Sequence, residues 1–297
     1  MPVPPSRKQS IAIVGAGNLA AALAVSLLAA GYQVEVIISR GAASSVQRAR
    51  RLALEVGAST VTLDQAQIGA EIVWFCVPDA AIASAARSLL KSADWKGKVA
   101  LHSSGALTSD ELYVLQDKGS AVASAHPLMT FVRGSRPQLT GVPFAIEGDQ
   151  KAVRSVRAIV RSLRGRAWLI RKEHKQAYHA WGMFVSPLLT ALLAASENVA
   201  AAAGVSKKAA RQKMLPILHQ TLANYARLGA AASFSGPIAR GDVDTVRKHL
   251  KILRTVPQAG EVYLALARLA LRELPAKNRV QLEKILKLKT KMNKPTY

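Results

Sequence analysis

Three small residues near the start of the chain have the types and spacing that allow a turn to hold phosphate groups. Gly15, Gly17 and Ala20 stand in the order G-x-G-x-x-A, directly after the apolar run IAIV. The first glycine allows a tight bend, the second lets the backbone approach a pyrophosphate, and the small third residue lets a helix pack closely on the strands. The N–H groups at the start of that helix then face the phosphates. The spacing predicts a dinucleotide site that includes Ala16, the alternative being a turn that serves packing alone.

The end of the next predicted strand indicates which dinucleotide binds. Residues 34–38 read as a strand, and folds that bind NAD usually place an acidic side chain just after it to hold the adenosine ribose. This chain has Ser39 and Arg40 there instead, and a hydroxyl with a guanidinium suits a 2′-phosphate. We therefore expect NADP rather than NAD. In the alternative interpretation Arg40 is a solvated loop residue, since more arginines follow within residues 48–51.

Histidines and serines follow two further predicted strands. Residues 98–101 form a strand that ends in HSSG, and residues 121–125 form one that ends in HP. At such positions His126 can donate a proton or a hydrogen bond to a substrate, and Ser103 and Ser104 can contact the nicotinamide amide or a substrate carboxylate. The structural alternatives are that His126 holds its turn and that the serines only cap their loop.

These strand ends belong to a regular alternation of strands and helices. Residues 71–77 form an apolar run typical of a strand covered on both faces. Helices are expected between the strands, at residues 48–56, 80–90 and 109–118. The alternation predicts an α/β fold with a doubly wound parallel sheet of the Rossmann type, whose ligands bind beyond the carboxyl ends of the strands. Further strands are expected near residues 144–146 and 168–170.

From residue 172 onward the pattern changes to helices alone. They are expected over residues 179–203, 206–228, 242–256 and 260–274, with the last residues, 278–297, as a basic helix. Ser206 and Asp242 have side chains that cap helix N-termini. We predict a Rossmann nucleotide-binding domain over residues 9–171 and an all-helical domain over residues 172–297. Because the helical domain is rich in Ala and Leu, we expect a homodimer through it.

The composition limits the other functions that the chain could have. Its formal net charge of +23 would steer anionic ligands, but no nucleic-acid-binding motif and no metal-ligand spacing accompanies it, so we expect neither nucleic acid nor a metal as a partner. Its one cysteine, Cys76, lies in an apolar run and should be buried; no disulfide can form within the chain, so a cytoplasmic location is expected. Residues 11–34 carry no charged side chain, but glycines interrupt them, so no membrane span is expected.

Several segments occur in a familiar order: GAGNLA, VPDAAI, HSSGAL, HPLMTF, YHAWGMFVSPLL and SGPIARGDVDTVRKHL. Together they resemble a bacterial family of Rossmann-like proteins with a C-terminal domain of unknown function. The layout is more distantly similar to pyrroline-5-carboxylate reductase, ketopantoate reductase, prephenate dehydrogenase and deazaflavin-dependent NADP oxidoreductases. The resemblance implies cofactor contacts at turn residues on the strand ends, namely Gly15, Gly17, Asn18, Leu19, Val77, Pro78, Asp79, Ser103 and Ser104.

The sequence departs from the family at one position. Where the family usually has an asparagine in the helix after the YH pair, this chain has Pro187. That asparagine corresponds to a substrate-holding position in related reductases, so its replacement favours a protein that binds the cofactor without turnover. A proline inside that helix should also kink it.

Candidate substrate contacts lie in the helical part. His179 follows Lys175 by four residues on one predicted helix, so both could face the edge of the sheet. By analogy with related reductases Lys175 is a candidate acid or anion anchor, against a solvated lysine. Arg240 and Asp242 could form an ion pair that binds substrate, or Asp242 could cap its helix. We expect an NADP-dependent oxidoreductase that reduces a small anionic carbonyl or imine, ketopantoate-like or pyrroline-carboxylate-like, with catalysis at His126, Ser104 and His179. The alternative is an NADP-binding sensor or regulatory protein without turnover.

Overall fold

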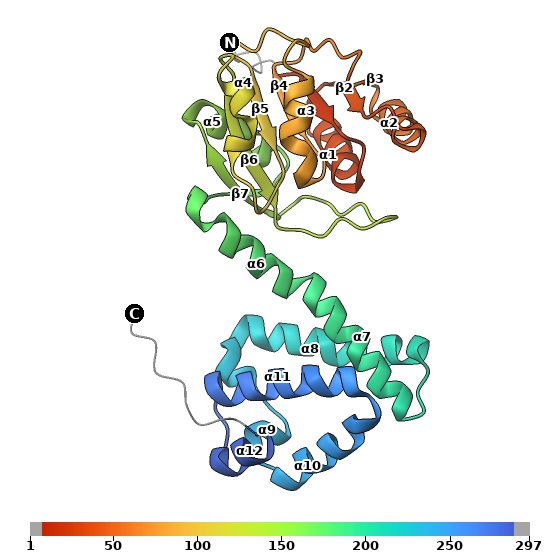
Figure 1. The fold of residues 1–297 in the computed structure, drawn as a ribbon, viewed down its shortest axis with the longest axis vertical. Helices are drawn as coiled ribbons and strands as arrows, with labels where there is room; N and C mark the ends of the chain where they lie inside the picture. The colour runs from red at the N-terminus through yellow and green to blue at the C-terminus, as the bar shows by residue number, and fades with distance from the viewer. Residues whose placement is uncertain (1–7, 288–297) are drawn as a thin grey trace, which may run out of the picture. The chain divides into compact units, whose positions relative to one another are not determined.

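The computed structural model describes residues 8–287 of the chain. The chain divides into two compact units, Met1–Phe184 and Val185–Tyr297 (Figure 1). The division falls later than the expected boundary after residue 171, because the helix that begins at Lys175 buries its first turns within the first unit.

One eight-stranded sheet forms the centre of the first unit. Its strands are β1 (Ile11–Val14), β2 (Val34–Ser39), β3 (Ser59–Thr62), β4 (Ile72–Phe75), β5 (Val99–His102), β6 (Ala121–Pro127), β7 (Pro143–Gly148) and β8 (Arg166–Leu169). They lie in the order β3-β2-β1-β4-β5-β6-β7-β8, and neighbours are parallel from β3 to β6. This confirms the predicted α/β class. The sheet is not parallel throughout, because β7 returns antiparallel to β6 through a loop and β8 lies parallel to β7.

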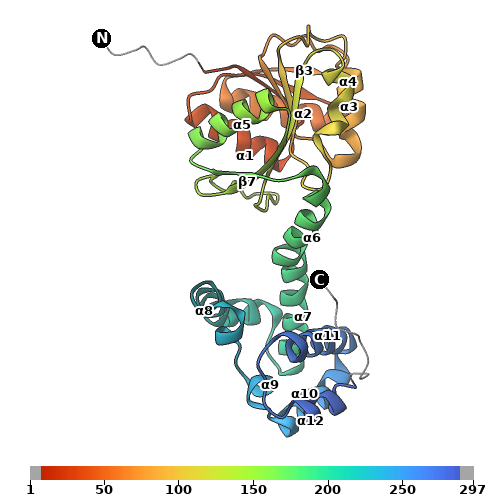
Figure 2. The same ribbon diagram turned by 90° about the vertical axis from the view of Figure 1, so that its left-hand side faces the viewer.

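Helices cover both faces of this sheet, as Figure 2 shows. The helices of this unit are α1 (Asn18–Ala29), α2 (Ala43–Val56), α3 (Ile82–Ser88), α4 (Tyr113–Gln116) and α5 (Gln150–Ser162), with 3₁₀ turns η1 (Asp79–Ala81), η2 (Ser109–Leu112) and η3 (Lys172–His174). The last helix, α6 (Lys175–Val185), leads away from the sheet. α1, α2 and α5 pack on one face, and α3 and α4 on the other. Along β1 the side chains alternate between the two cores, with Ile11 and Ile13 in one and Ala12 and Val14 in the other. Burial on both faces explains why the sequence runs are uninterrupted and apolar.

The second unit is helical, as predicted. Its helices are α7 (Pro187–Ala202), α8 (Lys207–Ser233), α9 (Pro237–Arg240), α10 (Val243–Ile252), α11 (Pro257–Glu273) and α12 (Arg279–Ile285), with a 3₁₀ turn η4 (Leu253–Thr255). The predicted cap of α8 is confirmed, because the Ser206 hydroxyl accepts a bond from the N–H of Ala209. Of the basic C-terminal helix that the sequence suggests, residues 288–297 lie outside the described residues.

The long helix expected over residues 179–203 is two helices. α6 ends at Val185, Ser186 has a non-helical backbone with φ −132° and ψ −78°, and Pro187 begins α7. A proline lacks the N–H that would continue a helix but suits the first position of a new one. The expected kink at Pro187 is therefore present as a complete break.

The same stretch, Lys172–Ala202, is long and apolar enough, by length and composition only, to cross a membrane. Its mean hydropathy is 1.4 over the most apolar window. The break at Ser186 and the burial of Lys175 and Tyr178 in the first unit make this weak evidence for a span. The stretch is better described as an apolar surface that the chain leaves exposed.

Candidate cofactor and catalytic site

The turn between β1 and α1 has the geometry that its glycines predict. Gly15 adopts a φ of +111°, and a Cβ there would lie 2.4 Å from the carbonyl oxygen of Cys76 at the end of β4, so no other residue fits. Gly17 is the residue before α1, and a Cβ there would meet no heavy atom within 4 Å. The backbone at Gly17 is therefore open to a ligand, while Gly15 closes the packing of β1 on β4.

A cavity of about 150 Å³ lies where β1, β2 and β4 end. The residues predicted to contact the cofactor make up much of its lining, namely Gly15, Ala16, Gly17, Ser39, Arg40, Val77 and Pro78. Ser39 is only 2% exposed, and among the described residues its hydroxyl is the one buried side-chain polar atom without a hydrogen-bond partner. Leaving a buried hydroxyl unpaired is costly, so a polar atom of a ligand is expected here. The cavity and its free hydroxyl fit the adenosine part of a dinucleotide.

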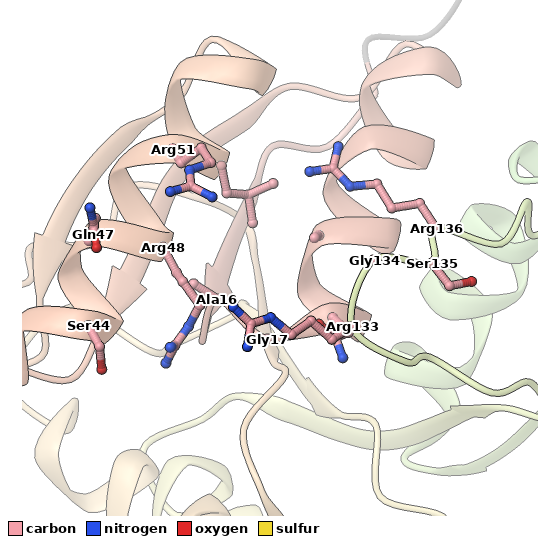
Figure 3. A pocket seen from close by; sticks show the side chains of 13 residues that line it. Ala16, Gly17, Ser44, Gln47, Arg48, Arg51, Arg133, Gly134, Ser135 and Arg136 are labelled. Carbon is pink, nitrogen blue, oxygen red and sulfur yellow. The ribbon is translucent and has the colours of Figure 1, made fainter.

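A second cavity, of about 1030 Å³, shares the glycine turn and Arg48 with the first. Figure 3 shows that Arg48 and Arg51 line it from α2, and Arg133 and Arg136 from the loop between β6 and β7. Arginines on two sides of a cavity attract phosphate groups. The loop arginines were not among the predicted contacts, because no local pattern brings residues 133–136 to the glycine turn.

The hydroxyl of Ser104, just after β5, makes its hydrogen bonds to neighbouring protein groups. It donates to Oδ2 of Asp79 at 2.8 Å and accepts from the backbone N–H groups of Ala106 and Leu107 at 3.2 and 2.9 Å. A serine hydroxyl has one proton and two lone pairs, so these bonds use all of them. The neighbouring Ser103 accepts from the indole N–H of Trp74 at 2.8 Å. The geometry favours the loop-capping alternative for Ser104, whereas Ser103 bonds a side chain of β4; the contacts of both serines with ligands stay predictions.

His126 is held at the end of β6 by a tyrosine of α6. Its Nδ1 lies 2.7 Å from the hydroxyl of Tyr178. Burial, with Lys175 and His179 nearby, lowers the pKa of His126 to about 4, and burial raises the pKa of Tyr178 to about 12. Both rings are therefore neutral near pH 7. In the tautomer with the Tyr178 hydroxyl as donor, the imidazole carries its proton on Nε2 and can donate it in a hydrogen bond.

His179 lies beside this ring, as the sequence suggests. The ring centroids of His126 and His179 are 6.4 Å apart. A Cβ at Gly105 would lie 3.0 Å from Nε2 of His126 and 2.8 Å from Cδ2 of His179, so only glycine fits against the two rings. The loop after β5 thus brings the HSSG, HP and YH segments of the sequence to one point.

Lys175 is fully buried, so the expectation of a solvated lysine is wrong. Its Nζ donates to the carbonyl oxygen of Ser104 at 3.0 Å and to the hydroxyl of Ser124 at 2.5 Å, and lies 3.9 Å from Oε1 of Glu147. Glu147 accepts from the backbone N–H and the hydroxyl of Ser109 at 2.7 and 2.8 Å. Burial lowers the pKa of Lys175 to about 8, although the charge of Glu147 opposes this. The ammonium group is bonded to protein groups and is not exposed to a substrate.

Sequence reasoning missed two residues that contact His126 and Lys175, namely Tyr178 and Glu147. Glu147 is a single carboxylate inside the apolar strand PFAIEG, and a lone charge in a buried strand signals an internal partner. Tyr178 precedes His179, but helix periodicity alone does not show which of the two side chains enters the core. Asn18 lines the cavity of about 1030 Å³, and its side chain donates to the carbonyl oxygen of Phe131 at 3.1 Å; its contact with a cofactor stays a prediction.

Arg240 and Asp242 lie in the second unit and bind each other. The guanidinium Nε and Nη2 of Arg240 lie 3.0 and 2.9 Å from Oδ2 of Asp242. Asp242 is the N-cap residue of α10, as expected, but its side chain makes no capping bond to the helix. The ion pair between the two side chains is present. The contact of this pair with a substrate stays a prediction.

A parallel sheet with this glycine turn and strand-end cavities defines a Rossmann-type dinucleotide-binding fold, here followed by a helical unit. Residues 10–102 match the family described as NADP oxidoreductase, coenzyme F420-dependent, and residues 142–270 match the domain of unknown function DUF2520. The two matches lie in the order that the resemblance implies, an oxidoreductase match over the sheet and a DUF2520 match that runs into the helical unit, and they confirm the resemblance.

Solved structures share the fold over nearly the whole chain. BF3122 from Bacteroides fragilis, described as a candidate NADP oxidoreductase, is 22% identical over 88% of this chain and 97% of its own, with a TM-score of 0.75. TM1727 from Thermotoga maritima is 24% identical over 93% of this chain and 99% of its own, with a TM-score of 0.67. A pyrroline-5-carboxylate reductase from Coxiella burnetii is 14% identical over 88% and 98%, with a TM-score of 0.60. No curated protein matches this chain.

Proposed function

We propose that this protein is an NADP-dependent oxidoreductase that reduces a small anionic carbonyl or imine. The observation that carries the proposal is that one edge of the sheet holds both the cavity with the unpaired Ser39 hydroxyl and the His126–Tyr178 pair. The match to an NADP oxidoreductase family and the likeness to a pyrroline-5-carboxylate reductase fold support it. The nicotinamide cofactor would supply the hydride.

In this proposal His126 is the hydrogen-bond donor that stabilises the charge developing on the substrate. Its neutral imidazole donates a hydrogen bond from Nε2 to the oxygen or nitrogen on which negative charge develops, and Tyr178 fixes the ring through Nδ1. Burial keeps the pKa of His126 near 4, so the ring acts as a positioned neutral donor and not as a cation. Ser39, Arg40 and the glycine turn hold the cofactor.

The preference for NADP over NAD is the first measurable consequence. Arg40→Asp should weaken NADPH binding on the order of tenfold or more and leave NADH binding nearly unchanged, because a charge-assisted bond to the 2′-phosphate is lost. Cofactor fluorescence titration measures both affinities. Arg50→Asp is the matched control, since Arg50 is exposed on α2 and lines neither cavity. Equal affinities of the unmodified protein for NADPH and NADH would contradict the proposed preference.

A cofactor-binding sensor without turnover is the second candidate. Pro187 in place of the family asparagine favours it, and so does the full occupation of the Ser104 hydroxyl within its loop. NADPH binds under either proposal, but only the enzyme consumes NADPH with some member of a panel of keto acids and cyclic imines.

We also propose a homodimer through the helical unit. No residue of α7 is buried, and large apolar side chains are exposed in this unit, among them Ile217 at 68% and Tyr225 at 60%. The second unit also has an apolar cavity of about 500 Å³ between α7, α10 and α11. A surface of this kind is typically covered by another chain. The cytoplasmic location and the anionic nature of the substrate stay predictions.

The dimer has its own test. Light scattering at micromolar concentration should give twice the mass of the chain, and Leu188→Glu on α7 should give the monomer mass, because a carboxylate cannot be buried in an apolar interface. Leu54→Glu is the control: Leu54 is 85% exposed on α2 in the first unit and should leave the dimer intact. A monomeric unmodified chain would rule the dimer out.

A further inference from the structure

The larger cavity is lined by the glycine turn, by α2 and by the loop between β6 and β7. This loop runs over residues 128–142, and Arg133, Gly134, Ser135 and Arg136 line the cavity (Figure 3). In a parallel sheet this position would hold a helix on the sheet face, but the antiparallel return of β7 leaves a long loop instead. The loop is thus free to extend across the start of α1.

Two contacts tie this loop to the helices beside the cavity. The side chain of Asn18, the first residue of α1, donates to the carbonyl oxygen of Phe131 at 3.1 Å. On the other side of the cavity Arg136 forms an ion pair with Glu55 of α2. The loop is therefore held at the start of α1 and at the end of α2, and Arg133, Gly134 and Ser135 between the two contacts line the cavity.

Most of the arginines that line the larger cavity have no carboxylate partner in the described part of the chain. Arg136 is paired, but Arg48, Arg51 and Arg133 have no carboxylate partner and no hydrogen bond among residues 8–287. Arg48 also lines the smaller cavity that holds the unpaired Ser39 hydroxyl. Arg133 and Gly17, where the N–H groups of α1 begin, line the same cavity (Figure 3). Free guanidinium groups on both sides of a helix N-terminus fit two separate phosphate groups.

We propose that the β6–β7 loop is a strap over the phosphates of the dinucleotide, in which Arg133 binds the pyrophosphate from the side opposite α1 and Arg48 joins Arg40 in binding the 2′-phosphate. This rests on the proposed NADP binding and adds to it the residues that hold the phosphates. It assigns Arg133, a residue far from the glycine turn in the sequence, to a group that NADPH and NADH share. Arg48 is assigned to the 2′-phosphate, which NADPH carries and NADH lacks.

Titration of the full-length protein with NADPH and with NADH tests the strap. Arg133→Gln should weaken both cofactors by the same factor, on the order of tenfold, because both carry the pyrophosphate. Arg48→Gln should weaken NADPH by a similar factor and NADH by less than about twofold. Arg133→Lys, which keeps the charge, should restore most of the affinity, and Arg50→Gln should behave as the unmodified protein. Circular dichroism confirms that each variant is folded.

The outcomes separate the two proposals. If the unmodified protein binds NADPH but Arg133→Gln binds both cofactors as tightly as Arg50→Gln does, the strap is wrong and NADP binding stands. A loss confined to NADPH in Arg133→Gln also overturns the assignment, since Arg133 would then hold the 2′-phosphate. If the unmodified protein binds neither cofactor, the proposed function fails and the strap fails with it.

Discussion

Replacing Lys175 with methionine should lower the free energy of unfolding of the first unit by about 3–5 kcal/mol, because removing one partner of a buried ion pair leaves the other charge buried and unpaired. Lys175 is fully buried and Glu147 nearly so, and Nζ bonds Ser104 and Ser124 as well. Urea unfolding followed by tryptophan fluorescence measures this, since all four tryptophans, Trp74, Trp95, Trp168 and Trp181, lie in the first unit.

Lys172→Met is the matched control for this experiment. Lys172 pairs with Asp110 at the surface, where an ion pair contributes about 0–1 kcal/mol. Because Glu147 is the group left unpaired, Glu147→Gln added to Lys175→Met should recover part of the loss. A change in Lys175→Met no larger than in the control would show that the buried pair does not stabilise the fold.

The difference between the unmodified protein and Lys175→Met should also depend on pH. Burial lowers the pKa of Lys175 from 10.5 to about 8, so the folded chain binds this proton less tightly than the unfolded chain does. Between pH 8 and 10.5 the unfolded state therefore holds more protons, and the stability that this group contributes rises with pH. The gap in unfolding free energy between the two proteins should widen over that range.

The second large effect is expected at His126. His126→Asn should lower kcat by about 100-fold or more and leave the affinity for NADPH nearly unchanged, because it removes one positioned donor at a distance from the cofactor phosphates. Tyr178→Phe, which removes only the bond to Nδ1, should cause a smaller loss. Because the pKa of His126 is near 4, its protonation should not lower kcat between about pH 5 and 8.

His219→Asn on α8 is the control for general loss of a histidine, since His219 is exposed in the second unit. NADPH oxidation with an active carbonyl or imine measures kcat, and fluorescence titration measures cofactor affinity. Full activity in His126→Asn, or a loss of cofactor affinity equal to the loss of rate, would show that the histidine is structural.

The local patterns of the chain predicted most of the secondary structure correctly. The apolar runs predicted β1 and β4 because a strand buried on both faces must be apolar along its whole length. β2 and β5 were recognised as mainly apolar runs that end in polar residues. The short strand β3 was missed, since STVT is partly exposed and its pattern is not distinct from a loop. The proline at position 187 predicted a kink, but whether the helix bends or breaks depends on the packing of its two halves.

The sequence by itself determined the dinucleotide turn, because the positive φ of Gly15 and the start of α1 after Gly17 depend on the conformation of a few adjacent residues. Only the tertiary structure decided the partners of Lys175, which come from β5, β6 and β7, and the arrival of Arg133 at the start of α1. On an isolated helix, water can solvate a long charged side chain such as lysine on any face. Whether it is buried or solvated is decided by groups distant in the sequence that meet it only when the sheet has formed.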